Sequence, residues 1–324
     1  MNIEAEKALA ALRDLLRSAV AEAEPDDVAL AALWVLQAEM LDLPEFGIRM
    51  LRRDLDRLAD LGRPGVTPSD DGAAIGSVDA TGVPGVVALA TGVRRARRSV
   101  EAHGLAIVGI RGAGALGILG LAARSLAADG TVALLAAQSP ASVAPWGAHA
   151  AAIGTNPLAL GVPRDDASPL VIDYATSALT LAAVREARAS GVLLPEGGAV
   201  DADGASTIDP AAVAALLPAG LVGSLTGLVV ELLAGVAVGG RVTDPGLPSS
   251  RGALLIAFDP ARAGGTDAAA AASALDRDWR AAGGHLPARF DILATGAAHL
   301  PTSVDLDGDD VAWLRDTASG TTRA

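Results

Sequence analysis

The chain has 324 residues, is 51% hydrophobic but only 2% aromatic, and carries a formal net charge of −13 at pH 7. This length suffices for one large domain or two modest ones, with a core built mainly from Ala, Val and Leu. The lack of cysteine excludes disulfides, thiolate catalysis and Cys-based metal sites, and the negative charge argues against a nucleic-acid-binding surface. The only lysine, Lys7, falls in a predicted amphipathic helix, which disfavours a Schiff-base mechanism.

The N-terminal part predicts three helices. The first ends near Pro25, the second begins with Asp26 as its N-cap and runs to about Met40, and the third covers residues 48–61. The chain opens with charged residues rather than an apolar segment, so we expect no signal peptide and a cytoplasmic location. Residues 62–73 are rich in Gly, Pro, Asp and Ser, which places a domain boundary there.

Beyond this boundary, strands and helices are expected to alternate. The expected strands are 76–78, 105–110, 132–137, 159–162, 170–172 and 254–258. The expected helices are 85–103, 118–128, 180–191, 221–238 and 311–317. Because Ser224, Thr226 and Glu231 interrupt the apolar stretch 221–238, we interpret it as a buried helix rather than a membrane span. Four arginines of the helix 85–103 are expected to form a solvated face: Arg94, Arg95, Arg97 and Arg98.

Gly112-Ala113-Gly114-Ala115-Leu116-Gly117 matches the G-x-G-x-x-G pattern of a Rossmann dinucleotide-binding turn, after a strand and before a helix. No acidic residue ends the next strand, which runs into Gln138, and a helical segment rather than a doubly wound sheet precedes the motif. We therefore favour a tight turn in an Ala- and Gly-rich chain over a Rossmann turn. Gly114 and Gly117 remain candidate cofactor contacts.

Two short stretches carry a family resemblance: Gly154-Thr155-Asn156-Pro157 and Asp173-Tyr174-Ala175-Thr176-Ser177. They resemble the paired signature of the malate/L-lactate/ureidoglycolate dehydrogenase family, the NAD(P)-dependent 2-hydroxyacid oxidoreductases with a non-Rossmann fold. Pro145-Trp146-Gly147 and Leu216-Leu217-Pro218 follow the order and spacing of the family.

The resemblance spans roughly residues 8–315 and implies an α/β fold with a mixed sheet, of the malate/L-lactate dehydrogenase type. We expect an N-terminal helical region, residues 1–72, to be joined by the C-terminal segment 285–324. Residues 73–284 would form the central mixed-sheet domain. The resemblance also implies a homodimer with the active site near its interface.

The departures from the family fall at its reactive positions. Phe46 stands where the family has a catalytic histidine, Met50 where it has an arginine that binds the substrate carboxylate, and Ala115 where it has a second histidine. Hydride transfer to or from a 2-hydroxyacid needs an acid/base and a cationic partner for the carboxylate. We therefore expect Glu45, Phe46, Met50 and Ala115 to line a reworked, more apolar substrate pocket.

Three residues remain as catalytic candidates: Asp173, Tyr174 and Arg49. Asp173 keeps the carboxylate of the family motif, Tyr174 is the only phenol, and Arg49 precedes the missing arginine by one position. Neighbouring residues on a strand point to opposite faces, so we expect only one of Asp173 and Tyr174 to face the site.

The family motifs also supply candidate cofactor contacts. In addition to the two glycines, these are Thr155, Asn156, Pro157, Thr176 and Ser177. Thr155 and Asn156 have the alternative role of holding a turn through side-chain-to-backbone bonds. The histidines show no metal-ligand spacing, so we expect no metal site.

Three functions remain open. The first is a divergent oxidoreductase that uses NAD or NADP on a small 2-oxo/2-hydroxy or cyclic imino acid-like substrate. The second is a lyase, cyclase or isomerase in the former cofactor cleft, and the third is a pseudoenzyme, a non-catalytic homologue that stabilises a partner. We expect a small-molecule substrate and neither a nucleic acid nor a membrane as partner.

Overall fold

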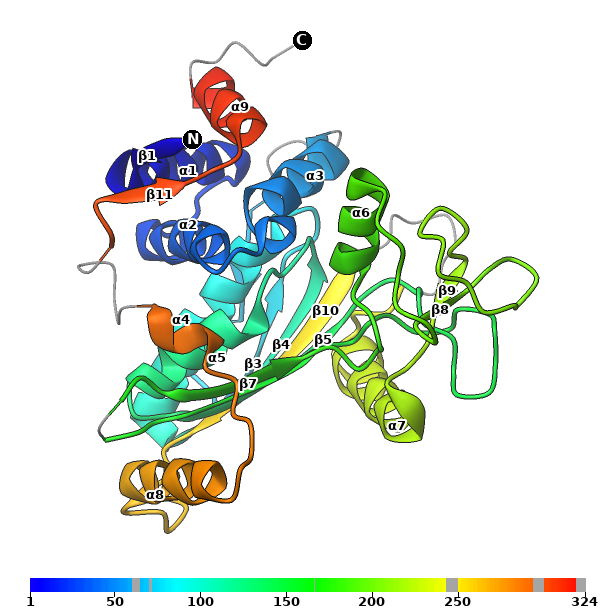
Figure 1. Cartoon of the computed structure of the whole chain (residues 1–324). Helices are drawn as coiled ribbons and strands as arrows, with labels where there is room; N and C mark the ends of the chain where they lie inside the picture. Colours follow the sequence, from blue (N-terminus) through cyan, green and yellow to red (C-terminus); the bar gives the residue numbers. More distant parts are fainter. Residues whose placement is uncertain (60–64, 70–71, 166, 243–249, 294–299, 319–324) are drawn as a thin grey trace.

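A seven-stranded mixed sheet forms the centre of the molecule in the computed structural model, which describes residues 1–59, 65–69, 72–165, 167–242, 250–293 and 300–318 (Figure 1). Strands β3 and β4 run parallel, and the other neighbouring strands run antiparallel. Each of the six predicted strands lies within one of these strands, which confirms the prediction. Their spatial order is β2 (Thr67–Pro68), β3 (Ile75–Asp79), β4 (Leu105–Ala113), β10 (Arg251–Phe258), β5 (Val132–Gln138), β6 (Leu158–Val162) and β7 (Leu170–Tyr174).

Helices cover both faces of the sheet. On one face lie α4 (Gly85–His103) and α5 (Leu119–Ala128), and on the other lie α7 (Gly220–Val230) and η3 (Glu231–Ala237), a π-helix. Alternation along β4 explains this arrangement. Side chains at even positions, such as Ile110, pack against α4, whereas Gly109 points the other way and faces Val238 at the end of η3.

The N-terminal region consists of α1 (Ala5–Ala19), α2 (Pro25–Met40), η1 (Pro44–Phe46) and α3 (Ile48–Leu58), with α2 packed on α4. The predicted N-cap of the second helix is wrong. Glu24 occupies that position and Pro25 begins the helix, because the fixed φ of proline suits the first helical turn and its missing N–H costs nothing there. The predicted end of the third helix, at residue 61, lies outside the described residues.

The two ends of the chain meet. Strand β1 (Asn2–Glu4) pairs antiparallel with β11 (Ser303–Asp305), and α9 (Gly308–Ala318) packs on α1. These contacts support our proposal that the C-terminal segment completes the N-terminal helical region. Within that segment, η4 (Arg289–Ile292) instead lies against α5, where Phe290 contacts Gly120.

A small peripheral unit and one further helix complete the fold. Helix α6 (Leu181–Ser190) and the pair β8 (Ala199–Val200) and β9 (Ala215–Leu216) share a separate apolar cluster. Helix α8 (Ala268–Ala281) has no counterpart among the predicted elements, because its alanine-rich sequence has no stripe of large apolar residues.

The helix predicted to be buried at 221–238 is exposed along one face, which corrects the prediction. Gly220–Ala237 is long and apolar enough to cross a membrane by length and composition, and 28% of it is buried. An all-apolar helix is typical of a core, but the sheet covers only the face that carries Gly227, Val230 and Ala234. Seven large apolar residues on the uncovered face are 47–76% exposed: Leu221, Val222, Leu225, Leu228, Val229, Leu232 and Val236.

Candidate functional site

The glycine-rich loop after β4 packs against a carboxylate of the protein itself. Asp54 on α3 is buried, accepts the backbone N–H of Gly85 at 3.2 Å and pairs with Arg57 at 2.9 Å. A Cβ atom at Gly114 would lie 2.0 Å from Asp54 Oδ2, so this glycine leaves room for the carboxylate. A pyrophosphate at Gly114 would meet that negative charge. The structure thus agrees with a tight turn rather than a Rossmann turn.

Phe46 of η1 and Met50 of α3 lie beside Gly117, at the far end of the glycine-rich loop. At Gly117, which has a φ of 75°, a Cβ atom would lie 3.5 Å from Met50 Cε and 3.8 Å from the carbonyl oxygen of Phe46. Met50 is buried, and Phe46 and Ala115 are half-buried. The structure therefore brings an apolar corner together where the resemblance implies the substrate pocket. Glu45 turns to Arg53, with which it pairs at 3.0 Å.

Asp173 lies next to this corner, at the N-terminal end of α5. Its Oδ2 accepts the backbone N–H of Gly120 at 2.8 Å, three residues beyond Gly117. The ring of Phe290 packs on the same glycine and helps to enclose the carboxyl group. Burial raises the pKa of Asp173 to about 6, against the opposing effects of the Gly120 N–H and the positive charge of Arg289. Near neutral pH this carboxyl group can therefore both accept and release a proton.

The other two catalytic candidates lie elsewhere. Tyr174 ends the edge strand β7 and is 45% exposed, so it points to the side opposite Asp173, as the alternation of strand side chains predicts. Arg49 pairs with Asp307 at 3.1 Å and Asp310 at 3.4 Å. Successive side chains of a helix point about 100° apart, so Arg49 projects away from the side of α3 that carries Met50. The two ion pairs hold its side chain on the C-terminal segment. The structure thus does not support Arg49 as a site residue.

Most of the predicted cofactor contacts form a structural joint. Asn156 is fully buried with a φ of 38°, accepts the N–H of Ser139 at 3.2 Å and donates to the Gly227 carbonyl at 3.0 Å and Glu231 at 2.9 Å. It thereby ties the end of β5 to α7 and η3. These bonds favour the turn-holding role for Asn156, and its contact with a cofactor remains a prediction.

The second signature closes the same joint. The N–H and the hydroxyl group of Thr176 both donate to the Thr155 carbonyl at 3.0 Å, and the Ser177 hydroxyl donates to the Leu179 carbonyl. Thr176 and Ser177 are buried, so their polar groups are already used inside the protein. The roles of these residues, and of Pro157 in the first signature, towards a cofactor remain predictions.

Glu39, which the sequence pattern did not mark as a site residue, lies behind the apolar corner. It is buried in α2, and its Oε1 accepts the Ile48 N–H at 2.6 Å, at the start of α3. Burial, and to a smaller degree the charge of Asp310, raises the pKa of Glu39 to about 7.

We expect Glu39→Gln to stabilise the protein at alkaline pH. Because the folded state raises this pKa from 4.5 to about 7, the contribution of Glu39 to stability is fully present below pH 4.5 and is lost as the pH rises through 7. The amide keeps an acceptor for Ile48. Thermal unfolding at pH 8.5 should show a gain of up to about 3 kcal/mol, and at about pH 4 little change. An equal gain in stability at both pH values would contradict this prediction. The same gain in the control variant Glu6→Gln, at an exposed position, would also contradict it.

Two arginines that the sequence patterns did not single out approach the site from other elements. Arg251 begins β10 and pairs in register with Ala113, beside the glycine-rich loop. Arg185 projects from α6, which packs against η1. A charged residue at the first position of an otherwise apolar strand was the available signal for Arg251.

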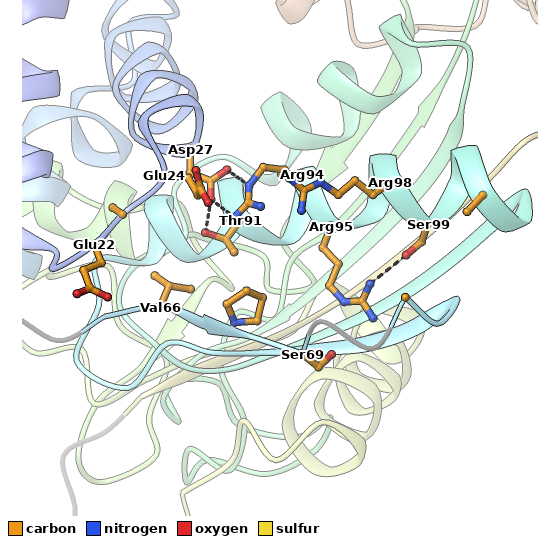
Figure 2. Close-up of a pocket in the computed structure, with 14 residues that line it drawn as sticks. Glu22, Glu24, Asp27, Val66, Ser69, Thr91, Arg94, Arg95, Arg98 and Ser99 are labelled. Carbon is orange, nitrogen blue, oxygen red and sulfur yellow. Dashed lines mark hydrogen bonds and ion pairs between the residues drawn. The ribbon is translucent and has the colours of Figure 1, made fainter.

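The predicted solvated arginine face is only partly exposed, which corrects that prediction. Arg94 makes a bidentate pair with Asp27 at 2.8 and 2.9 Å (Figure 2). Arg95 is buried and donates to the carbonyls of Ala73 and Ile75. Both line a pocket of about 400 Å³ beside the second half of α4. Three arginines and three carboxylates line this pocket, so their charges balance. The other two arginines of the cluster are exposed.

Metal ligands do not cluster in the part of the chain that the structure describes, where no group of three or more His, Asp or Glu side chains has the geometry to hold an ion.

Comparison with known proteins identifies what the chain resembles. Residues 3–288 match the family model described as malate/L-lactate dehydrogenase. The chain is 37% identical over 185 residues to (2R)-3-sulfolactate dehydrogenase (NADP(+)) of Chromohalobacter salexigens, covering 54% of this chain and 56% of that protein. It is 38% identical over 208 residues to Delta(1)-pyrroline-2-carboxylate/Delta(1)-piperideine-2-carboxylate reductase of Pseudomonas syringae pv. tomato, covering 60% and 61%. The chain thus spans less than two thirds of the length of these curated relatives.

The structural match is more extensive. The crystal structure of delta1-piperideine-2-carboxylate reductase from Pseudomonas syringae pv. tomato superposes with a TM-score of 0.84 at 30% identity, covering 98% of this chain and 99% of that one. The predicted mixed-sheet, non-Rossmann fold is therefore confirmed over nearly the whole chain.

Proposed function

The chain belongs to the malate/L-lactate dehydrogenase family, and we propose that it is an oxidoreductase that uses NAD or NADP on a small 2-oxo/2-hydroxy acid or cyclic imino acid. The observation that carries the proposal is Asp173, a half-buried carboxyl group with a pKa of about 6 beside the Phe46–Met50 corner. A group with this pKa is suited to proton transfer near neutral pH.

The apolar corner favours a cyclic imine within this range. Reduction of a carbonyl group requires a proton donor at the oxygen, a role that the family resemblance gives to histidine. A cyclic imine needs a single proton, at its nitrogen, which Asp173 can supply, and it needs no second donor in the place of the histidine. Phe46, Met50 and Ala115 offer no proton, but they exclude water and pack against a hydrocarbon ring. The similarity to reductases of cyclic imino acids supports the same substrate class.

The surroundings of the site fit a nicotinamide dinucleotide, which when bound supplies or accepts the hydride. Arg251 places positive charge beside the glycine-rich loop, and Arg185 adds positive charge near η1, as an anionic cofactor requires. Gly117, with a φ of 75°, forms the turn at the apolar corner, where a Cβ atom would be in van der Waals contact with Val86 Cγ1 at 3.4 Å and Met50 Cε at 3.5 Å. In this arrangement Asp173 holds or releases a proton at its carboxyl group, held in place by the N–H of Gly120.

The test is a calorimetric titration of the purified protein with NADH and NADPH, followed by assays with Δ1-piperideine-2-carboxylate, Δ1-pyrroline-2-carboxylate and 2-oxo acids. We expect micromolar binding of one dinucleotide and turnover of at least one acid. No binding at millimolar dinucleotide would contradict the proposal and favour a non-redox enzyme or a non-catalytic homologue. A cytoplasmic location agrees with the proposal, because the reduced dinucleotides are intracellular cofactors.

We further propose that the enzyme is a homodimer that buries the exposed face of α7 and η3. The helix is built into the fold on its other face, where Glu231 is buried and pairs with Arg241 and Asn156, so lipid cannot surround it. The exposed residues repeat three to four positions apart along one stripe, which is typical of a helix that packs against a partner. A second copy of this chain offers an equally apolar surface.

Val222→Glu combined with Val229→Glu is expected to convert the dimer to a monomer, because each places a charge on the exposed stripe, where the wild-type residues are 76% and 52% exposed. Light scattering during size-exclusion chromatography measures the change in mass. The matched control is Leu275→Glu, at a position on α8 that is 56% exposed, which should leave the mass unchanged. A wild-type monomer at micromolar concentration, or an unchanged dimer in the double variant, would contradict the proposal.

A further inference from the structure

An excess of positive charge surrounds the point where α3, α6 and the start of β10 meet. We call this set the arginine cluster. It comprises five arginines and two carboxylates, a formal excess of three positive charges in a chain whose net charge is −13. The members are Arg53, Arg57, Arg185, Arg188, Arg251, Glu45 and Asp54.

The two carboxylates of the arginine cluster are already engaged. Asp54 pairs with Arg57 at 2.9 Å and accepts the N–H of Gly85, and Glu45 pairs with Arg53 at 3.0 Å. Arg188, on the outer side, donates to the Pro210 carbonyl at 2.6 Å. Among the residues that the structure describes, neither Arg185 nor Arg251 donates a hydrogen bond or forms an ion pair. The excess charge therefore lies on Arg188, which a carbonyl does not neutralise, and on the guanidinium groups of Arg185 and Arg251.

Keeping the half-buried charge of Arg251 without a partner costs free energy. Burial lowers the pKa of Arg251 from its usual value, and the positive charges of Arg57 and Arg185 lower it further against the attraction of Asp54. Burial also lowers the pKa of Arg185, with Arg53 and Arg188 acting in the same direction. A half-buried cation such as Arg251 among like charges destabilises a fold unless an anion neutralises it, whereas Arg185 is exposed to solvent.

The position of the two arginines relates them to the site. Arg251 faces Ala113 in the β-ladder, directly before the glycine-rich loop, whose Gly117 lies beside Met50 and Phe46. Arg185 acts electrostatically on Glu45, the neighbour of Phe46 in the chain. Met50, in turn, leaves this corner without the guanidinium group that the family resemblance places there.

We propose that Arg185 and Arg251 together bind an oxyanion, the carboxylate of the substrate or a phosphate of the dinucleotide. Guanidinium groups bind either anion through paired N–H donors. The inference rests on the proposed function for the identity of the ligand, but the site itself can be tested without a dinucleotide. It assigns a role to two residues from elements that the active-site motifs do not include.

The test is a calorimetric titration of the ligand-free protein at low salt with oxalate, as a carboxylate probe, and with 2′,5′-ADP, as a phosphate probe. Arg185→Gln and Arg251→Gln are each expected to weaken binding of at least one probe about 10- to 100-fold. Arg98→Gln, which removes the same charge from an exposed position on α4, should change affinity less than about twofold. Dependence on the arginines with oxalate assigns the site to the substrate, and with 2′,5′-ADP to the cofactor.

A second measurement separates binding from packing. Without a ligand, Arg251→Met should raise the midpoint of thermal unfolding, because it removes a half-buried charge that no partner compensates. A lower midpoint together with unchanged anion affinity would overturn the proposal, as would the absence of binding of either probe to the wild type. If the probes bind through the arginines but NADH and NADPH do not bind, the oxyanion site stands and the redox function fails.

Discussion

Asp173→Asn is expected to lower kcat/KM for the proposed reaction by about 10²- to 10⁴-fold, the usual contribution of a general acid or base. The amide still accepts the Gly120 N–H, so the side chain keeps its place at the end of α5. It loses the ability to take up and release a proton. The wild-type rate should change with an apparent pKa near 6, and the variant should lose that change.

Asp173→Asn is expected to keep or raise the stability of the fold at pH 8, although it lowers the activity. The pKa of Asp173 is raised from 3.8 to about 6, so its contribution to stability is fully present below pH 3.8 and is lost as the pH rises through 6. The asparagine variant should therefore be at least as stable as the wild type at pH 8, as measured by circular dichroism on heating. This separates a loss of chemistry from a loss of structure.

Tyr174→Phe is the matched control for the catalytic assignment. Tyr174 is adjacent in sequence but 45% exposed on the opposite side of β7, so its variant should keep kcat/KM within about threefold. If Tyr174→Phe were inactive and Asp173→Asn active, the assignment of the acid/base would be wrong. Full activity of both variants would leave the proposed proton transfer without a residue.

Asn156→Ala is expected to lower the free energy of unfolding by about 3–5 kcal/mol, the largest effect on stability that we foresee. The substitution removes three hydrogen bonds in a fully buried position, to the Ser139 N–H, the Gly227 carbonyl and Glu231. It also forces alanine to adopt a φ of 38°, a conformation that asparagine tolerates better. Urea unfolding followed by circular dichroism measures the difference.

Two controls divide this effect into its parts. Asn156→Gly keeps the backbone freedom and loses the bonds, so it should be about 1 kcal/mol less damaging than alanine. Asn2→Ala, at an exposed position in β1, should change stability by less than about 0.5 kcal/mol. A cost below about 1 kcal/mol for Asn156→Ala would show that the joint between β5 and α7 contributes little.

The glycine motif alone does not predict which group fills the space at Gly114. The spacing of the glycines and their place between a strand and a helix match a dinucleotide-binding turn. The carboxylate that fills the space at Gly114 comes from Asp54, sixty residues earlier in the chain. Nothing in the motif itself distinguishes a glycine that admits a phosphate from one that admits an aspartate of α3.

The sequence by itself determined the family, and with it the mixed-sheet fold, because the signatures at 154–157 and 173–177 keep their order and spacing. It also determined six strands of the central sheet and most helices, because apolar periodicity is a local property that burial on one face imposes. The departures at Phe46, Met50 and Ala115 were likewise visible, since each is a change of residue type within a motif.

Only the tertiary structure decided which side chains meet and which faces remain uncovered. It placed β10 between β4 and β5, which brought Arg251 to the glycine-rich loop, and it directed Asp173 to α5 and Arg49 to Asp310 of α9. It also left one face of α7 and η3 exposed, although their composition is that of a core helix. Burial, charge pairing and pKa depend on neighbours that are distant in sequence, and periodicity along the chain carries no information about those neighbours.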